Sequence, residues 1–399
     1  VQPPDGNHLE ESGGDGGMKW EKVKLGELYE VHNGLSKAGK FFGEGYPFLT
    51  FSTVFNNYFI PKQITDLVQS TEKEQESYSI RRGDVFVTRT SETSDELGMS
   101  CVALKDYPMA TYNGFTKRMR PITNRVLPEY IGYYMRLPNF RGEFRAFSTM
   151  TTRASLRNED LLGLEVKLPS IEIQKQIADI LSAYDDLIEN NQKQIKLLEE
   201  ATQRLYKEWF VDLRFPGHEN TKIVDGVPEG WSRTNINEIL TFHRGYDLTK
   251  NEMKAGRYPV VGSTTVIGYH NEFKIKGPGI VTGRSGSLGK YQFIWDNFWP
   301  HNTSLYISDY KDHNIFFVYS LLQTVDFASL NNGGAIPTLN RNVLSNIEVI
   351  EPTDELQEMF AKIAEAQYRK IRNLEKQNNQ LKMARDVLLP KLMSGEVEV

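Results

Sequence analysis

The 399-residue chain lacks the features that mark several classes of protein. Its single cysteine, Cys101, excludes an intrachain disulfide and any metal site built from several thiolates. With so little cysteine, a reducing cytoplasm is the simplest compartment to expect. No apolar run approaches the ~20 residues that a membrane-spanning helix requires, so we expect no membrane span.

The sequence also lacks recognisable catalytic motifs. It has no Asn/Asp-Pro-Pro-Tyr/Phe motif, no Gly-x-Gly-x-x-Gly phosphate loop and no carboxylate–lysine set typical of nucleases. His32 and His243 have no neighbouring histidine or acid at ligand spacing, which favours a structural role over a metal or base role. We therefore expect neither a bound metal nor a catalytic residue in this chain.

An internal repeat is the main feature that the sequence does contain. The stretch 161–169 recurs as 344–352, at an offset of 183, and a long amphipathic segment follows each copy. The same offset relates Gln174 to Gln357. A second correspondence, at an offset of 211, matches Trp20, His32 and Gly34 with Trp231, His243 and Gly245. The matched segments form a repeated frame around two divergent regions of unequal length, which we call the bodies. Such an arrangement indicates one molecule that engages two related targets.

The two amphipathic segments have the periodicity of long helices. Apolar residues recur every three or four positions, which is the pattern of a coiled-coil seam. The first seam contains Ile173, Ile177, Ile180, Tyr184, Ile188, Ile195, Leu198 and Leu205, and the second contains Leu356, Phe360, Ile363, Ile371, Leu374, Leu381 and Leu388. Because one body lies between the two helices in the chain, we expect them to pair antiparallel.

Local signals predict where these helices begin and end. Proline followed by Ser170 or Thr353 predicts the two helix starts, and Pro390 with Gly395 predicts the end of the second helix. Asn191 and Asn378 interrupt the seams. Each asparagine either faces water or forms a buried amide contact that sets the register.

The bodies show short strands and turns. Residues 85–88 and 280–282 predict buried strands, and 291–295 predicts a half-buried one. Each body ends in a helical stretch, at 128–137 and 315–324. We expect an α+β fold in which two mixed domains are separated and bridged by two long antiparallel coiled-coil helices, with a pseudo-twofold repeat. The expected boundaries are 1–17 for an added tag, 18–168 and 230–350 for the bodies, and 169–229 and 351–399 for the helices and linker.

A glycine-rich loop at 283–290 follows one predicted strand. Its Arg284, Ser285, Ser287 and Lys290 can contact phosphates or base edges, although a plain hairpin turn uses similar residues. The loop is not a Walker loop, because the Gly-Lys-Ser/Thr ending is missing. In the first body the corresponding strand leads to Arg89 and Thr90 with fewer glycines, as two different specificities would require and as sequence drift would also produce.

Two further clusters combine basic and aromatic residues. One contains Arg141, Arg145 and Arg153 with interleaved phenylalanines, and the other contains Lys117 and Arg118. Residues 18–168 carry a net charge of +3 and residues 231–350 carry +2, whereas 169–230 carry −5. Such clusters suit a groove along DNA, where arginine neutralises phosphates and reads guanine, and a solvated charged face is the alternative.

The chain resembles the specificity subunit of type I restriction–modification systems. The resemblance rests on the helix entry at 168–181, the heptad run that follows it, the ending at 388–397 and the loop at 283–290. The second helix entry, at 352–357, is looser, and the first body lacks the glycine-rich loop.

The resemblance implies a non-catalytic role. Two target-recognition domains would each read half of a split, asymmetric site in double-stranded DNA. The paired helices would set their spacing and dock modification subunits, which use S-adenosylmethionine. Restriction subunits would add ATP-driven translocation and cleavage, so that this chain itself would bind no cofactor. Two other functions stay open on the residues alone: a coiled-coil scaffold whose bodies bind protein, and an enzyme with an undetected site.

Overall fold

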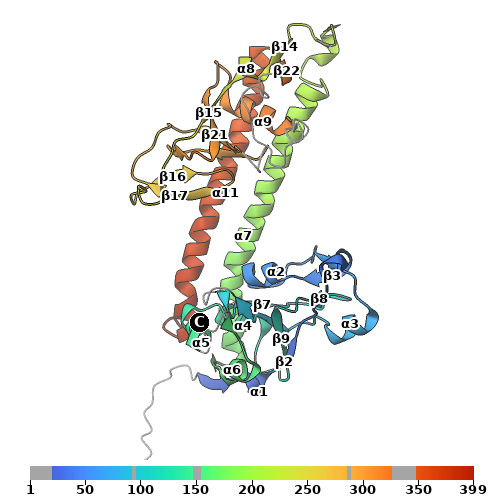
Figure 1. The fold of residues 1–399 in the computed structure, drawn as a ribbon, viewed down its shortest axis with the longest axis vertical. Helices are drawn as coiled ribbons and strands as arrows, with labels where there is room; N and C mark the ends of the chain where they lie inside the picture. Colours follow the sequence, from blue (N-terminus) through green and yellow to red (C-terminus); the bar gives the residue numbers. More distant parts are fainter. Residues whose placement is uncertain (1–19, 92–95, 147–153, 285–288, 326–346) are drawn as a thin grey trace, which may run out of the picture. The chain divides into compact units, whose positions relative to one another are not determined.

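The computed structural model describes residues 20–91, 96–146, 154–284, 289–325 and 347–399 (Figure 1). The chain divides into two compact units. The first unit comprises Val1–Ile188 and Asn379–Val399, and the second comprises Glu189–Asn378. Each unit therefore contains one body and one segment of each long helix.

The first body is built on two sheets. The four-stranded sheet has the order β2 (Tyr29–Asn33), β9 (Thr116–Pro121), β5 (Val85–Thr88), β7 (Ser100–Val102), with every pair antiparallel. The three-stranded sheet has the order β4 (Leu67–Val68), β3 (Phe42–Leu49), β8 (Thr111–Tyr112), in which β3 is antiparallel to β4 and parallel to β8. Two short pairs complete the strands: β1 (Glu21–Lys24) with β11 (Glu165–Leu168), and β6 (Thr90–Ser91) with β10 (Ala154–Ser155). The body's helices are α1 (Leu25–Leu28), α2 (Phe51–Asn56), α3 (Glu72–Ser77), α4 (Pro128–Tyr134), α5 (Pro138–Ala146) and α6 (Asn158–Gly163).

The second body repeats the topology of both sheets. Its four-stranded sheet has the order β15 (Thr241–Arg244), β21 (Ser304–Asp309), β18 (Gly279–Gly283), β19 (Tyr291–Ile294), again antiparallel throughout. Its three-stranded sheet has the order β17 (Val266–His270), β16 (Tyr258–Val261), β20 (Trp299–Pro300), with β16 antiparallel to β17 and parallel to β20. The remaining elements are the pairs β12 (Ile223–Val224) with β13 (Val227–Pro228) and β14 (Ser232–Asn235) with β22 (Glu348–Glu351), and the helices α8 (Ile236–Ile239) and α9 (Ile315–Thr324). The internal repeat therefore extends from the sequence frame to the fold of the bodies.

Local sequence explains the central elements of both bodies. The predicted strand at 85–88 is β5, and all four of its side chains are buried because both faces of the strand are covered: Val85 and Val87 belong to one hydrophobic core and Phe86 to another. The predicted strand at 280–282 is the centre of β18, and the predicted helix at 315–324 is α9. Helix α4 begins at Pro128, where the fixed φ of proline suits the first helical position.

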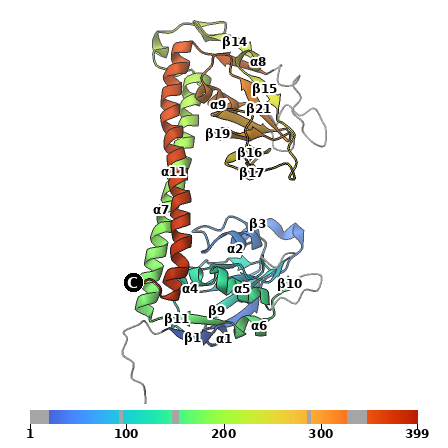
Figure 2. The same cartoon turned by 90° about the vertical axis from the view of Figure 1, so that its left-hand side faces the viewer.

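The two long helices are α7 (Ile171–Tyr206) and α11 (Asp354–Ser394), and a π-helical turn (Lys207–Val211) follows α7 (Figures 1 and 2). In the first unit Ile177 and Leu181 of α7 belong to the same core as Leu389, Leu392 and Met393 of α11. The ion pair between Asp185 and Arg385 also joins the two helices there.

In the second unit the contacts between α7 and α11 show an antiparallel pair. Asn191 contacts Asn378 and Thr202 contacts Gln367, so that residue numbers rise along one helix as they fall along the other. The Asn191 Nδ2 donates to the Asn378 Oδ1 over 3.0 Å, with both side chains buried. The buried-amide alternative for these two asparagines is therefore the one that the structure shows.

Two details of the predicted seam are wrong. Ile180 and Ile363 are 36% and 39% exposed, whereas their neighbours Leu181 and Ala364 are fully buried. Adjacent apolar residues offer a helix two alternative faces, and packing onto the neighbouring core selects one of them.

Pro390 does not end the second helix, which is also a correction. Helix α11 continues to Ser394, and Gly395 follows with a φ of +77°. The turn that contains Pro390 also carries Leu389, Leu392 and Met393 into the core of the first unit. Their burial outweighs the cost of about 3 kcal/mol that proline imposes on a helix interior.

A buried glutamine ties the start of each long helix to its body. Gln174 Oε1 accepts the Leu127 N–H at 2.9 Å, and its Nε2 donates to the Arg125 and Pro169 carbonyls, both at 3.0 Å. Gln357 is its repeat partner, with Nε2 donating to the Pro352 carbonyl at 2.8 Å. The matched glutamines of the sequence repeat thus perform matched structural roles.

Candidate nucleic-acid interface

The structure places Arg89 and Arg284 at equivalent positions of the two bodies. Arg89 directly follows β5 and Arg284 directly follows β18, the third strand in the order of each four-stranded sheet. The Arg89 N–H donates to the Phe115 carbonyl at 3.0 Å, and the Arg284 N–H donates to the Thr303 carbonyl at 3.2 Å. Both side chains are partly exposed, so both arginines are accessible at the end of a buried strand.

The turn that faces each arginine is built in the same way in both bodies. The Asn113 N–H donates to the Leu49 carbonyl at 3.0 Å, and the His301 N–H donates to the Val261 carbonyl at 2.9 Å. Two residues later in each turn come Phe115 and Thr303. The hydroxyl of the next residue then closes the turn. Thr116 donates to the Asn113 carbonyl and Ser304 donates to the His301 carbonyl, both at 2.7 Å. The two turns therefore share a backbone and differ in the side chains that they carry.

Glycine is required beside each turn. A Cβ on Gly34 would lie 2.1 Å from the Asn113 carbonyl oxygen, and one on Gly245 would lie 2.1 Å from the His301 carbonyl oxygen. Such close approach of two backbones is possible only without a side chain. The matched glycines of the repeat therefore allow the backbone after β2 and after β15 to pack directly against the two turns.

The surroundings of the two arginines differ in chemistry. Arg89 donates from Nη1 to the Asn33 Oδ1 at 3.3 Å. Near Arg284, the partly exposed Asn302 donates to Asp247, which also pairs with Arg244 at 3.5 Å. Lys290 is exposed at the start of the segment that leads into β19. Different polar groups on one framework are what two related but distinct binding specificities would need.

Lys117 and Arg118 are not available as surface ligands, which corrects one prediction. They are 6% and 3% exposed, on β9 in the interior of the four-stranded sheet. Lys117 donates to Asn158, while Arg118 donates to the Ser79 carbonyl at 2.7 Å and lies over the Tyr112 ring. Burial lowers the pKa of both groups, and the nearby charge of Arg89 lowers that of Lys117 further. Both side chains are internal braces of the first body.

The run of arginines and phenylalanines is divided between core and surface. Phe140 and Phe144 are 3% and 0% exposed and belong to the core of the first unit. Arg141 is half-buried and donates from Nη2 to the Leu97 carbonyl at 3.1 Å, so that it braces the segment after β6. The side chains of Thr90 and Arg145, and the residues Arg153, Ser285 and Ser287, lie outside the described part of the chain.

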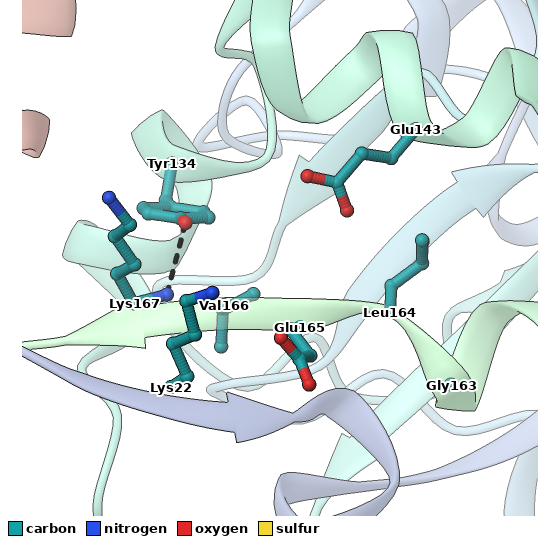
Figure 3. A pocket seen from close by; sticks show the side chains of 8 residues that line it. All are labelled: Lys22, Tyr134, Glu143, Gly163, Leu164, Glu165, Val166 and Lys167. Atoms are coloured by element: carbon teal, nitrogen blue, oxygen red, sulfur yellow. Dashed lines mark hydrogen bonds between the residues drawn. The ribbon is translucent and has the colours of Figure 1, made fainter.

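Neither Arg89 nor Arg284 lines either of the two described cavities. The cavity in Figure 3, of about 410 Å³, lies in the first unit between α5 and β11. Glu143 and Glu165 line it with Lys22 and Lys167, and the Lys167 N–H donates to the Tyr134 hydroxyl at 3.0 Å. Burial and then the charge of Glu165 raise the pKa of Glu143, and Lys22 opposes them. Opposite charges thus largely balance in this cavity.

The second cavity, of about 310 Å³, lies in the second unit. Glu199 of α7 lines it together with Tyr291, Tyr319 and Tyr368. Burial raises the pKa of both Glu199 and Glu375 of α11, and a neighbouring carboxylate raises it further, Glu200 for Glu199 and Glu199 for Glu375.

The ranges that the structure describes contain no metal site and no membrane-spanning helix. No three His, Cys, Asp or Glu side chains among these residues could hold a metal ion. None of the described helices is long and apolar enough to cross a membrane. His243 Nδ1 contacts the Arg244 carbonyl at 2.7 Å, and its ring packs beside Tyr246 and Tyr306.

Phe115 and Thr303 were missed by the sequence predictions. The Asn113-Gly114 dipeptide before Phe115 is a strong turn signal, and it could have drawn attention to this position. No local signal marks Thr303, whose role becomes visible only when the two turns are compared.

Comparisons with known proteins agree with this architecture. The family model described as "Type I restriction modification DNA specificity domain" matches residues 18–200 and 228–383. The chain is 26% identical to the type I restriction enzyme MjaIX specificity subunit of Methanocaldococcus jannaschii, over 95% of this chain and 94% of that one. It is 23% identical to the HindI specificity subunit of Haemophilus influenzae, over 95% of this chain and 99% of the relative.

A solved structure shares the fold. The S subunit of a type I restriction–modification system from M. genitalium superposes with a TM-score of 0.58 at 18% identity, covering 95% of this chain and 97% of that chain. Specificity subunits are the non-catalytic components of these systems. The family match covers more than half of the sequence, once in each half of the repeat, and the chain therefore belongs to the type I restriction–modification DNA specificity family.

Proposed function

We propose that each body reads one half of a bipartite, asymmetric site in double-stranded DNA. The first body would use the site around Arg89, and the second would use the site around Arg284. The observation that carries this proposal is the shared backbone of the two arginine sites combined with their different side chains. Equal frameworks would hold two segments of duplex in the same manner, while different side chains would select different bases.

The chemistry of the sites supports DNA as the ligand. Arginine forms paired hydrogen bonds with guanine in the major groove and with phosphates along the backbone. Asn33, Asn302 and Lys290 add amide and ammonium groups, which suit base edges and phosphates respectively. Contacts to phosphates would make binding strongly dependent on salt concentration.

We further propose that α7 and α11 set the separation of the half-sites and dock the modification subunits. Several apolar side chains of these helices are exposed, among them Leu187, Leu197, Met383 and Val387 at 51% to 69%. Exposed apolar side chains on polar helices are suited to a protein interface. S-adenosylmethionine would then be bound by the modification subunits, and ATP by restriction subunits that act as translocases, rather than by this chain.

The test is to map adenine methylation in cells that express the chain with its partner methyltransferase. Arg89→Ala is expected to relax recognition of one half-site and Arg284→Ala that of the other, since each good base contact contributes about 1–3 kcal/mol of discrimination. Arg257→Ala is the matched control, because Arg257 is exposed and precedes β16, whereas the turn of the arginine site contacts Val261 at the other end of that strand. If neither half-site changes in either arginine variant, the assignment of these residues is wrong.

The spacing proposal has a separate test. Seven extra residues would be inserted into each long helix, after Asn190 and after Asn378, so that Asn191 and Asn378 stay on the same side of the insertion and the heptad seam and the pairing are preserved. The insertion lengthens the pair by about 10 Å, or about three base pairs. Methylation mapping should then show a longer spacer and unchanged half-sites. An unchanged spacer in an active complex would refute the role of the helices as a ruler.

A further inference from the structure

Phe115 is an exposed aromatic residue on a turn that is held firmly in place. Its side chain is 56% exposed. The Phe115 N–H donates to the Asn113 Oδ1 at 2.7 Å, and the Phe115 carbonyl accepts the Arg89 N–H at 3.0 Å. With both of its backbone polar groups hydrogen-bonded, Phe115 presents its ring to the solvent from a rigid support.

The turn beneath the ring is also tightly packed. A Cβ on Gly114 would lie 2.2 Å from the Ser36 Oγ and 3.1 Å from the Leu35 carbonyl oxygen. The Thr116 hydroxyl closes the turn by donating to the Asn113 carbonyl at 2.7 Å. Such a turn loses little conformational entropy when a ligand covers its side chain, because the backbone is already ordered.

The second body has no aromatic residue at this position. Thr303 occupies the place of Phe115, and its carbonyl accepts the N–H of Arg284 at 3.2 Å and the hydroxyl of Ser263 at 2.7 Å. The Thr303 hydroxyl contacts the His301 Nδ1 at 3.0 Å. One body therefore offers an apolar ring beside its arginine, and the other offers a hydroxyl group.

We propose that Phe115 is a specificity-determining residue of the first half-site, and that its ring contacts the C5-methyl group of a thymine. The inference rests on the proposed function, since it requires that the first body bind DNA through the Arg89 site. Thymine presents its methyl group in the major groove, where arginine also reads guanine. A neighbouring arginine and phenylalanine therefore suit a half-site in which a thymine lies next to a contacted guanine or phosphate.

The experiment measures DNA binding by the complex of the full-length chain with its partner methyltransferase. The probes are a duplex that carries the methylated site and a series in which each thymine of the first half-site is replaced by uracil, which lacks only the methyl group. The wild-type complex should lose affinity about fourfold at one position, the value expected for one buried methyl group. Phe115→Ala should bind the unmodified duplex more weakly and show no loss with uracil at that position.

Two variants serve as controls. Phe115→Leu keeps an apolar side chain and should restore most of the response to uracil. Thr303→Ala should alter recognition of the second half-site and leave the uracil response of the first half-site intact. Because Phe115 is exposed, its variants are expected to fold, and thermal unfolding of each variant checks this directly.

The outcomes separate this inference from the proposed function. Specific binding without any uracil response, a response that persists in Phe115→Ala, or a first half-site without thymine would each overturn the role of Phe115 and leave DNA recognition standing. A wild-type complex that shows no sequence preference would overturn the proposed function itself.

Discussion

The hydrogen bond between Asn191 and Asn378 permits a quantitative test of how the two long helices are held in register. Both amides are buried, at 8% and 6% exposure, and the Nδ2 to Oδ1 distance is 3.0 Å. We consider Asn191→Leu, Asn378→Leu and the double variant, because leucine is close to asparagine in shape and has no polar group. The variants therefore remove one amide or both without opening a large cavity.

Each single variant should be less stable than the double variant. Losing the bond costs about 1 kcal/mol and the remaining amide, buried without a partner, costs about 1–3 kcal/mol more. A single substitution should therefore destabilise the protein by about 2–4 kcal/mol. The double variant buries no unpaired amide and should be within about 1 kcal/mol of the wild type. The double-mutant cycle should thus depart from additivity by at least about 3 kcal/mol.

Urea unfolding of the full-length chain, followed by circular dichroism, measures these differences. Additive effects of the two substitutions would show that the amides do not depend on one another, and would refute the reasoning.

Register itself can be measured by crosslinking. A disulfide between Thr202→Cys and Gln367→Cys should form in the wild-type background and lose yield in the double leucine variant, because an apolar seam tolerates slippage. Cys101 should not interfere, since burial raises the pKa of its thiol to about 12.

Three further predictions concern single positions. Gln174→Ala should destabilise the first unit by about 2–4 kcal/mol in urea unfolding, because it removes three buried hydrogen bonds. The control Gln176→Ala, at an exposed position, should be nearly neutral, and equal effects of the two substitutions would contradict the prediction. Gly34→Ala should prevent the close approach of two backbones and abolish DNA binding, while Gly39→Ala, with open space around it, should bind normally. Glu375→Gln should raise the melting temperature at pH 8 and have no effect near pH 4. Folding raises the pKa of the Glu375 carboxyl, so the protein loses stability as the pH rises from the ordinary pKa through the raised value, and glutamine removes that loss. The same change in melting temperature at both pH values would contradict this explanation.

The long helices could be predicted from the sequence because their signal is local and repeated. Apolar spacing over more than 30 residues, with a capping Ser170 before the first helix, is sufficient to predict a paired amphipathic helix. The equivalence of Arg89 and Arg284 could also be predicted, since a run of buried residues before each arginine indicates a strand. The burial of Lys117 and Arg118 could not, because two basic residues in a row usually lie on the surface.

The sequence by itself determined the repeat, the two antiparallel helices and the α+β bodies, since these follow from periodicity and residue type along continuous segments. Only the tertiary structure decided which basic residues are accessible, that Asn191 meets Asn378, and that Phe115 and Thr303 occupy equivalent turns. These outcomes depend on contacts between residues far apart in the chain. Burial of the surrounding core sets those contacts, and no local pattern carries information about which distant backbone will lie next to a given side chain.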